Sequence, residues 1–349
     1  MVHERTLRRR RSTTGDAALD ARIEELVQAA GLERDADLLV EMLATVLRMA
    51  RRQPARGDLK LVNAALKEFA HAFRVFAAYK GVRKVSVFGS SRLTDEDPVS
   101  LCAEEFARRM VREGWMAITG AGPGVMEAAQ RGAGADRSFG LNIKLPLGSE
   151  VNPVIESDPK LITFRYFFTR KVTFLKESDA FVLLPGGFGT LDELFELLTL
   201  VQTGKSDLHP VVLLAPPGET YWNEWRAIVE ERLAARGLIS LDDLHLVHMT
   251  NDVEDAVREV VGFYRNYQSQ RYVDGRLVLR LRRAPGADQL PGLSEEFADL
   301  LESGSFEVAP PLPPEVADED ALDLERLAFH FNRRSYGRLR DLVDRLNAL

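Results

Sequence analysis

The stretch Ala180–Glu193 reads AFVLLPGGFGTLDE, and it joins an unbroken apolar run to a glycine-rich turn and then to a segment with helical spacing. A continuous apolar run is typical of a strand that is covered on both faces. Three glycines in four positions leave the turn without Cβ atoms, so a ligand can approach its main chain closely. The stretch therefore predicts a buried strand over 180–184, a turn, and a helix from Leu191 to about Val201.

Short β-branched runs alternate with helical stretches on both sides of this unit, from Val82 to Arg265. The runs that predict strands are 84–88, 115–118, 139–143, 161–164, 180–184, 211–214 and 246–249, and single helices are expected over 99–113, 222–236 and 253–265. Strands that alternate with helices at this spacing indicate a parallel sheet with helices on both faces. We therefore expect an α/β, Rossmann-like fold that binds ligands beyond the carboxyl ends of its strands.

The N-terminal part of the chain has a different pattern. Residues 1–14 contain a run of arginines and predict a mobile basic tail. Residues 15–80 predict a helical segment, with one helix over 16–52 and a second over 58–80, because apolar residues recur there at spacings of three and four. This segment would cap the sheet or contribute to a subunit interface.

The strand–helix alternation occupies 81–266, and a C-terminal extension follows over 267–349. We expect one or two strands around Asp274 in this extension. The segment 284–320 is rich in proline, glycine and acidic residues, so it predicts a loop that carries one short helix. The segment 321–349 predicts a helix or a helix pair.

Composition excludes several classes of protein. The chain of 349 residues has a net charge of −7, which argues against nucleic acid as its main partner. It has no apolar run of the roughly 18 residues that a membrane span needs, and its basic start lacks the apolar segment of a secretory signal. The single cysteine, Cys102, fits a reducing cytoplasm. His245 and His248 do not form a zinc-binding His-Glu-x-x-His motif, so we predict no metal site.

The glycine turn before the helix has the features of a phosphate site. The N–H groups of Gly187 to Thr190 lie at a helix start, where they lack intrahelical partners and face the positive end of the helix dipole. The Thr190 hydroxyl adds a further donor. Alternatively, Thr190 and Glu193 form a capping box that only closes the helix end. A cap alone does not need three glycines, Pro185 and an exposed Phe188, so we favour a ligand site that includes Gly186, Gly187, Gly189 and Thr190.

Two further turns follow strands and therefore fall on the same edge of the sheet. Gly120–Gly124 is not a dinucleotide fingerprint, because Val125 stands where the third glycine belongs. The chain also lacks the Gly-Lys-Ser/Thr of a P-loop. This turn and the turn Gly89–Ser91 are either ordinary strand connections or parts of the ligand site. We include Ser90, Gly122 and Gly124 among the candidate nucleotide-binding residues.

Arg170 and Lys171 lie on the predicted helix before the strand at 180–184, beside the aromatic residues 166–168. A charge pair of this kind is either a solvated face or a source of positive charge for an anionic ligand. The aromatic residues are more typical of a hydrophobic core than of a base-stacking site.

The motif Pro185–Glu193, preceded by Thr169, Arg170 and Lys171, resembles the Pro-Gly-Gly-x-Gly-Thr-x-x-Glu motif of the LONELY GUY (LOG) family, which was long labelled "possible lysine decarboxylase". The resemblance covers about 82–265. The turns after the first two strands are similar to those of the larger bacterial branch of the family. Nothing around Lys171 or Lys176 suggests the Schiff-base pocket that a decarboxylase of that kind would need.

The resemblance implies hydrolysis of a nucleoside 5′-monophosphate, AMP-like or a cytokinin riboside monophosphate, to a free base and ribose 5-phosphate. It implies that Arg170 and Glu193 are catalytic and that Gly186, Gly187, Gly189 and Thr190 bind the phosphate. Lys171 would help to balance the charge. The resemblance also implies a homodimer or higher homo-oligomer, and the reaction needs no cofactor. The alternative on the same fold is a non-catalytic carrier of a nucleotide or of molybdenum cofactor.

Overall fold

The computed structural model describes residues 13–31, 35–146, 148 and 150–349, which form two compact units, Met1–Lys67 and Glu68–Leu349. Most of the predicted basic tail, residues 1–12, lies outside the described residues. The end of that segment is not a tail, because Thr14 is buried and its N–H donates a hydrogen bond of 2.7 Å to Asp20 Oδ1.

The first unit contains α2 (Ala17–Ala29), α3 (Ala36–Arg51) and the start of α4 (Arg56–Phe76). The expectation of a single helix over 16–52 was wrong. The chain turns between α2 and α3, where Gly31 and Asp35 both have positive φ angles that an α-helix cannot contain. Ile23, Val27 and Ala44 form the small buried core between these two helices.

The second unit is built on a seven-stranded sheet in the order β4-β3-β2-β1-β5-β6-β7, and every strand pair in it is parallel. Its strands are β1 (Lys84–Phe88), β2 (Met116–Thr119), β3 (Ser138–Ile143), β4 (Leu161–Phe164), β5 (Ala180–Leu183), β6 (Val211–Leu214) and β7 (His248–Thr250). Strands β2 to β4 extend the sheet from one side of β1, and β5 to β7 extend it from the other. The strand order therefore reverses between β1 and β5, which is where open α/β sheets bind ligands.

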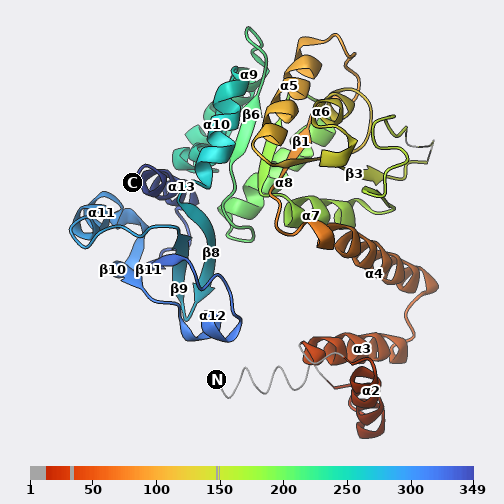
Figure 1. Cartoon of the computed structure of the whole chain (residues 1–349). Helices are drawn as coiled ribbons and strands as arrows, with labels where there is room; N and C mark the ends of the chain where they lie inside the picture. The colour runs from red at the N-terminus through yellow and green to blue at the C-terminus, as the bar shows by residue number, and fades with distance from the viewer. Residues whose placement is uncertain (1–12, 32–34, 147, 149) are drawn as a thin grey trace. The chain divides into compact units, whose positions relative to one another are not determined.

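Helices cover both faces of this sheet, so the fold is Rossmann-like, as predicted (Figure 1). On one face lie α5 (Pro98–Arg112), α6 (Val125–Ala133) and α10 (Val253–Phe263), and on the other lie α7 (Phe167–Glu177) and α8 (Phe188–Gln202). The predicted single helix over 222–236 is instead three consecutive pieces, which are α9 (Tyr221–Ile228), a π-helical turn (Val229–Leu233) and a 3₁₀ turn (Ala234–Arg236). Short 3₁₀ turns also occupy Ala77–Tyr79, Ala135–Arg137, Leu241–Leu246 and Ala298–Leu300.

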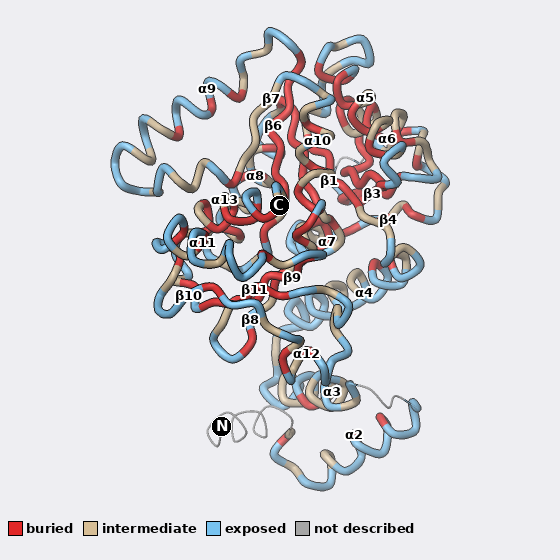
Figure 2. Tube along the Cα trace, turned by 60° about the vertical axis from the view of Figure 1, so that its left-hand side comes forward, coloured by how far each residue is buried: buried red, intermediate tan, exposed pale blue. Residues whose placement is uncertain are grey.

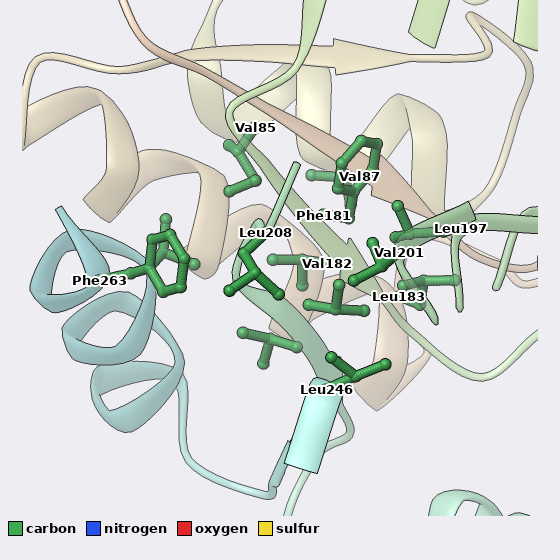
Figure 3. Close-up of a cluster of buried hydrophobic side chains, with 14 of the residues drawn as sticks. Val85, Val87, Phe181, Val182, Leu183, Leu197, Val201, Leu208, Leu246 and Phe263 are labelled. Atoms are coloured by element: carbon green, nitrogen blue, oxygen red, sulfur yellow. The ribbon is translucent and has the colours of Figure 1, made fainter. Parts of the chain in front are cut away.

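The core lies where β1 and β5 contact the helices. All five residues of β1 and all four of β5 are buried, as expected of central strands in a sheet that is covered on both faces (Figure 2). Leu183 of β5 and Leu197 and Val201 of α8 belong to one buried cluster (Figure 3), whereas Val85 and Val182 point to the opposite face of the sheet. The core is therefore continuous through both faces of the central strands.

The C-terminal extension contains a second sheet, which is antiparallel, in the order β10-β11-β9-β8. Its elements are β8 (Tyr267–Val273), β9 (Arg276–Leu281), α11 (Leu290–Glu296), β10 (Leu301–Ala309), α12 (Pro313–Ala317), β11 (Glu325–Phe331) and α13 (Tyr336–Asn347). The expectation of one or two strands around Asp274 is confirmed by β8 and β9. The predictions of a loop over 284–320 and of helices alone over 321–349 were wrong, because these segments contain β10 and β11. β11 pairs with β9, and β10 pairs with β11, so both strands depend on partners that are distant in sequence.

Among the described residues, the helices all fall short of the length and hydrophobicity that crossing a lipid bilayer requires.

Candidate active site

Three turns meet at the edge of the sheet where the strand order reverses, and the main chain of Ser90 ties them together. The Ser90 N–H donates a hydrogen bond of 3.1 Å to the Pro185 carbonyl, and the Ser90 carbonyl accepts one of 3.0 Å from the Val125 N–H. Gly124 has a φ of +68°, and a Cβ there would lie 2.5 Å from the Ser90 carbonyl oxygen. Gly124 thus serves the close approach of two turns.

Helix α8 begins at Phe188, earlier than predicted, with Gly187 as its N-cap. Gly187, Phe188 and Gly189 are exposed, and the first turn of α8 contains no acidic residue. The expected role of the Thr190 N–H was wrong, because this group donates a hydrogen bond of 3.1 Å to the Gly187 carbonyl. The N–H groups of Phe188 and Gly189 precede the first α-helical hydrogen bond, so the start of α8 can accept an anion.

The capping box is not formed. Thr190 lies inside α8, and its side chain is buried against Gly186, where a Cβ would lie 2.1 Å from the Thr190 hydroxyl oxygen. Gly186 therefore serves packing within the turn. Its carbonyl also accepts a hydrogen bond of 2.6 Å from the Tyr221 hydroxyl, which anchors the turn to α9. Sequence reasoning missed Tyr221, because nothing in the local pattern connects α9 with this turn.

Arg170 reaches the same place from α7. Its guanidinium lies between the rings of Phe167 and Phe174, with the carbon Cζ 5.9 Å and 5.4 Å from the ring centroids. Its Nε is buried and has no hydrogen-bond partner among the described residues. Burial lowers the pKa of Arg170, and the negative charge of Glu193 opposes that shift. Arg170 is therefore a partly desolvated cation that interacts with the carboxylate of Glu193.

Glu193, on the second turn of α8, is the acidic residue that faces Arg170. Its side chain is only 13% exposed. Burial raises the pKa of Glu193 to about 7, although the positive charges of Lys171 and Arg170 act in the opposite direction. A carboxyl group with this pKa can exchange a proton near neutral pH, which is the property that general acid–base catalysis needs.

Lys171 contacts three carboxylates of α8. Its Nζ lies 2.8 Å from Asp192 Oδ2, 3.6 Å from Glu193 Oε2 and 2.5 Å from Glu196 Oε2. Burial lowers the pKa of Lys171, but hydrogen bonds to Asp192 and Glu196 and the charge of Glu193 outweigh this effect and leave the pKa raised. A Schiff-base lysine needs a lowered pKa, so Lys171 does not have that character. Its contacts join α7 to α8 behind Glu193.

A cavity of about 720 Å³ brings the candidate residues together, and its lining includes Ser90, Arg170, Gly187, Gly189, Thr190 and Glu193. A neighbouring cavity of about 450 Å³ is lined by Gly120, Gly122, Asn142 and Leu145, and it shares Ser91, Met126 and Arg170 with the first. Gly124, Gly186 and Lys171 line neither of these two cavities. These three residues therefore contact the residues that form the cavity walls and do not form the walls themselves.

Sequence reasoning missed Arg92 and Met126, which line the larger cavity. The expectation that residues 166–168 belong to the core was wrong for Phe167, which is exposed and stands in the same lining. Arg92 follows the first predicted turn by one residue, and Met126 follows the second by two. Their position after a strand end was the available signal. Phe188, 94% exposed, stands in the same lining.

Comparisons with known proteins found a family model and several curated enzymes that match this sequence. A family model described as "Possible lysine decarboxylase" matches residues 123–260. The cytokinin riboside 5′-monophosphate phosphoribohydrolase of Mycobacterium tuberculosis is 30% identical over 178 residues, which cover 50% of this chain and 91% of that protein. A probable enzyme of the same name from Oryza sativa subsp. japonica is 29% identical, and the match covers 37% of this chain and 56% of that protein. The enzyme of the same name from Arabidopsis thaliana is 33% identical, and the match covers 28% of this chain and 45% of that protein. The chain thus spans about half the length of these two plant relatives.

Among solved structures, the molybdenum cofactor carrier protein of Chlamydomonas reinhardtii is 22% identical, with a TM-score of 0.36 over 52% of this chain and 96% of the carrier.

Proposed function

Because the chain belongs to the LONELY GUY family, we propose that it hydrolyses the N-glycosidic bond of a nucleoside 5′-monophosphate, AMP-like or a cytokinin riboside monophosphate. The products would be a free base and ribose 5-phosphate. The observation that carries the proposal is the pairing of Glu193, whose pKa is raised to about 7, with the partly desolvated guanidinium of Arg170 in the lining of one cavity.

The start of α8 would hold the 5′-phosphate. The N–H groups of Phe188 and Gly189 and the positive end of the helix dipole favour a dianion there, and Arg92 in the same lining supplies positive charge. Glu193 lies on the second turn of the same helix. The phosphate grip would therefore fix the ribose close to the carboxylate, so that binding energy from the phosphate supports the chemical step.

In the chemical step, water attacks C1′ of the ribose as the bond from C1′ to the base nitrogen breaks. Positive charge develops on the ribose in an oxocarbenium-like transition state, and negative charge develops on the departing base. The ionised carboxylate of Glu193 would stabilise the first charge and accept the proton of the attacking water. Arg170 would stabilise the second charge until the base takes a proton from solvent.

Lys171 would act through Glu193 rather than on the substrate, because it does not line the two cavities of the site and is held by three carboxylates. The assembly as a homodimer or higher oligomer and the cytoplasmic location belong to the same proposal.

The test is to incubate the purified full-length protein with AMP and to separate the products by chromatography. Adenine and ribose 5-phosphate in equal amounts support the proposal. AMP that is bound but unchanged supports the non-catalytic carrier instead. Adenosine is the matched control, because it lacks only the phosphate, and an equal rate on adenosine would show that the start of α8 does not hold the substrate.

A further inference from the structure

Glu68, on α4, contacts the beginning of the helix that carries Arg170. Its carboxylate accepts a hydrogen bond of 2.9 Å from the Arg165 N–H and a second from the Thr169 hydroxyl. Further along the same two helices, Lys176 Nζ lies 4.7 Å from the centroid of the Phe73 ring. The C-terminal half of α4 therefore contacts α7 near both of its ends.

Helix α7 lacks a cap of its own. Its N-cap is Tyr166, which makes no side-chain cap hydrogen bond, and its first turn contains no acidic residue. A helix start without such partners leaves N–H groups unsatisfied and its positive dipole end uncompensated. Glu68 brings a negative charge to this end of α7 and holds it by two groups, the Arg165 N–H just before the N-cap and the Thr169 hydroxyl in the first turn.

The residues that Glu68 holds are adjacent to Arg170 in sequence. Thr169 is fully buried, and its carbonyl accepts a hydrogen bond of 2.8 Å from the Thr173 hydroxyl. The Arg170 N–H donates to the Tyr166 carbonyl across 3.3 Å, a long hydrogen bond for the first turn of a helix. The position of the Arg170 guanidinium thus depends on a turn whose own hydrogen bonding is weak.

We propose that Glu68 is a positioning residue that fixes the first turn of α7 and thereby aims Arg170 at the cavity that it shares with Glu193. The inference rests on the proposed function and extends it to α4, which precedes the residues 123–260 that the family model matches. It gives the helical segment before the sheet a role in the chemistry.

The experiment compares Glu68→Ala with Glu68→Gln, and Lys67→Ala serves as the matched control because Lys67 is an exposed neighbour on α4. Glu68→Ala should lower kcat on AMP about tenfold and change KM less than twofold, because the phosphate grip on α8 is untouched. Glu68→Gln should restore most of kcat. Its amide oxygen can accept from the Arg165 N–H, and its amide N–H can donate to Thr169, whose hydroxyl then donates to the Tyr166 carbonyl 2.9 Å away.

Two further measurements separate positioning from a general loss of stability. Hydrogen exchange should speed up at least tenfold at the amides of Arg165 and Arg170 in Glu68→Ala, but not in Glu68→Gln or Lys67→Ala. In a double-mutant cycle with Thr169→Val, the loss in kcat for the pair should be smaller than the product of the single losses, because both variants remove one shared hydrogen bond.

Unchanged kcat and unchanged α7 exchange in Glu68→Ala would overturn the inference, as would a rise in KM at constant kcat. If the wild-type protein releases no adenine, the proposed function fails. The exchange measurement then still decides whether Glu68 orders the start of α7, because it requires no turnover.

Discussion

At the scale of single residues, Glu193 concentrates the chemistry. Its pKa of about 7 results mainly from burial, and Lys171 and Arg170 prevent an even larger rise. The balance between burial and these two positive charges leaves both the protonated and the ionised form of Glu193 accessible near neutral pH.

Glu193→Gln tests this role directly. Glutamine keeps the shape of the side chain but cannot accept a proton or carry negative charge. We expect kcat on AMP to fall about 10²–10⁴-fold, the usual range for the loss of an acid–base group. The Kd for AMP, measured by calorimetry, should stay within threefold, because the start of α8 is unchanged. Full turnover by this variant would exclude Glu193 as the catalytic carboxylate.

The pH dependence of kcat follows from the same pKa. If the ionised carboxylate is the working form, kcat at saturating AMP should rise as pH increases from about 6, reach half its maximum near 7 and level off above about 8. We expect this rise in the wild-type protein and not in the residual activity of Glu193→Gln. A rate that falls over this range would assign Glu193 the role of a proton donor instead.

Stability should depend on pH in the opposite sense. The pKa of Glu193 is raised from 4.5 to about 7 on folding, so the folded protein holds this proton more tightly than the unfolded chain. Its contribution to the free energy of unfolding is therefore lost as pH rises from about 4.5 to 7, by a few kcal/mol in order of magnitude. We expect the free energy of unfolding of Glu193→Gln, measured with denaturant, to rise relative to that of the wild type between pH 5 and pH 8. A constant difference would contradict the raised pKa.

At the scale of elements, the close contact between two turns depends on Gly124. In Gly124→Ala, the new methyl group meets the Ser90 carbonyl at 2.5 Å, and the φ of +68° disfavours any side chain. We expect a loss of more than about 1 kcal/mol in the free energy of unfolding, together with a lower kcat.

Gly262→Ala is the control for Gly124→Ala, because Gly262 lies in α10 with open space around its Cβ position. That substitution should leave stability equal or raised by about 0.5–1 kcal/mol. Thermal unfolding measures both variants, and equal Tm values for the two would contradict the packing argument.

The central elements could be predicted from sequence because local pattern and tertiary environment agree there. The run at 180–184 is apolar throughout, and the strand it forms, β5, is buried on both faces. The convergence of three turns followed from the rule that parallel strands end at one edge. The hydrogen bonds of Glu68 at the start of α7 and the hydrogen bond from Tyr221 to the Gly186 carbonyl could not be predicted, because each joins elements that are distant in sequence.

The strand β11 shows the limit of local pattern in another way. Its sequence ERLAFHF has only seven residues and mixes apolar residues with Glu, Arg and His without strict alternation, so its pattern does not distinguish a strand from a helix. Its neighbours β9 and β10 decide the outcome by pairing with it on both sides. A buried ion cluster also joins β11 to β9, since Arg326 of β11 and Arg280 of β9 both contact Glu315.

At the scale of the whole molecule, the C-terminal sheet is part of the main hydrophobic core. Tyr267, Leu279, Phe329 and Leu342 belong to the same buried cluster as the strands of the parallel sheet. A chain that ends at residue 266 would expose the surface that these residues cover. We therefore expect the truncated chain to lack a cooperative thermal transition and the near-ultraviolet circular dichroism of the full chain. A truncated chain with a sharp transition and full AMP hydrolysis would show that the extension is dispensable.

The hydrogen bonds of Ser90 that tie the three turns together are made by peptide groups, and peptide groups survive every substitution except proline. Replacing the Ser90 side chain leaves both bonds in place, so evolution can change side chains around the cavity without disturbing the frame on which they sit. Diversity in the accepted base within such a lineage would then arise by exchanging wall residues such as Phe167 and Met126 on an inherited scaffold.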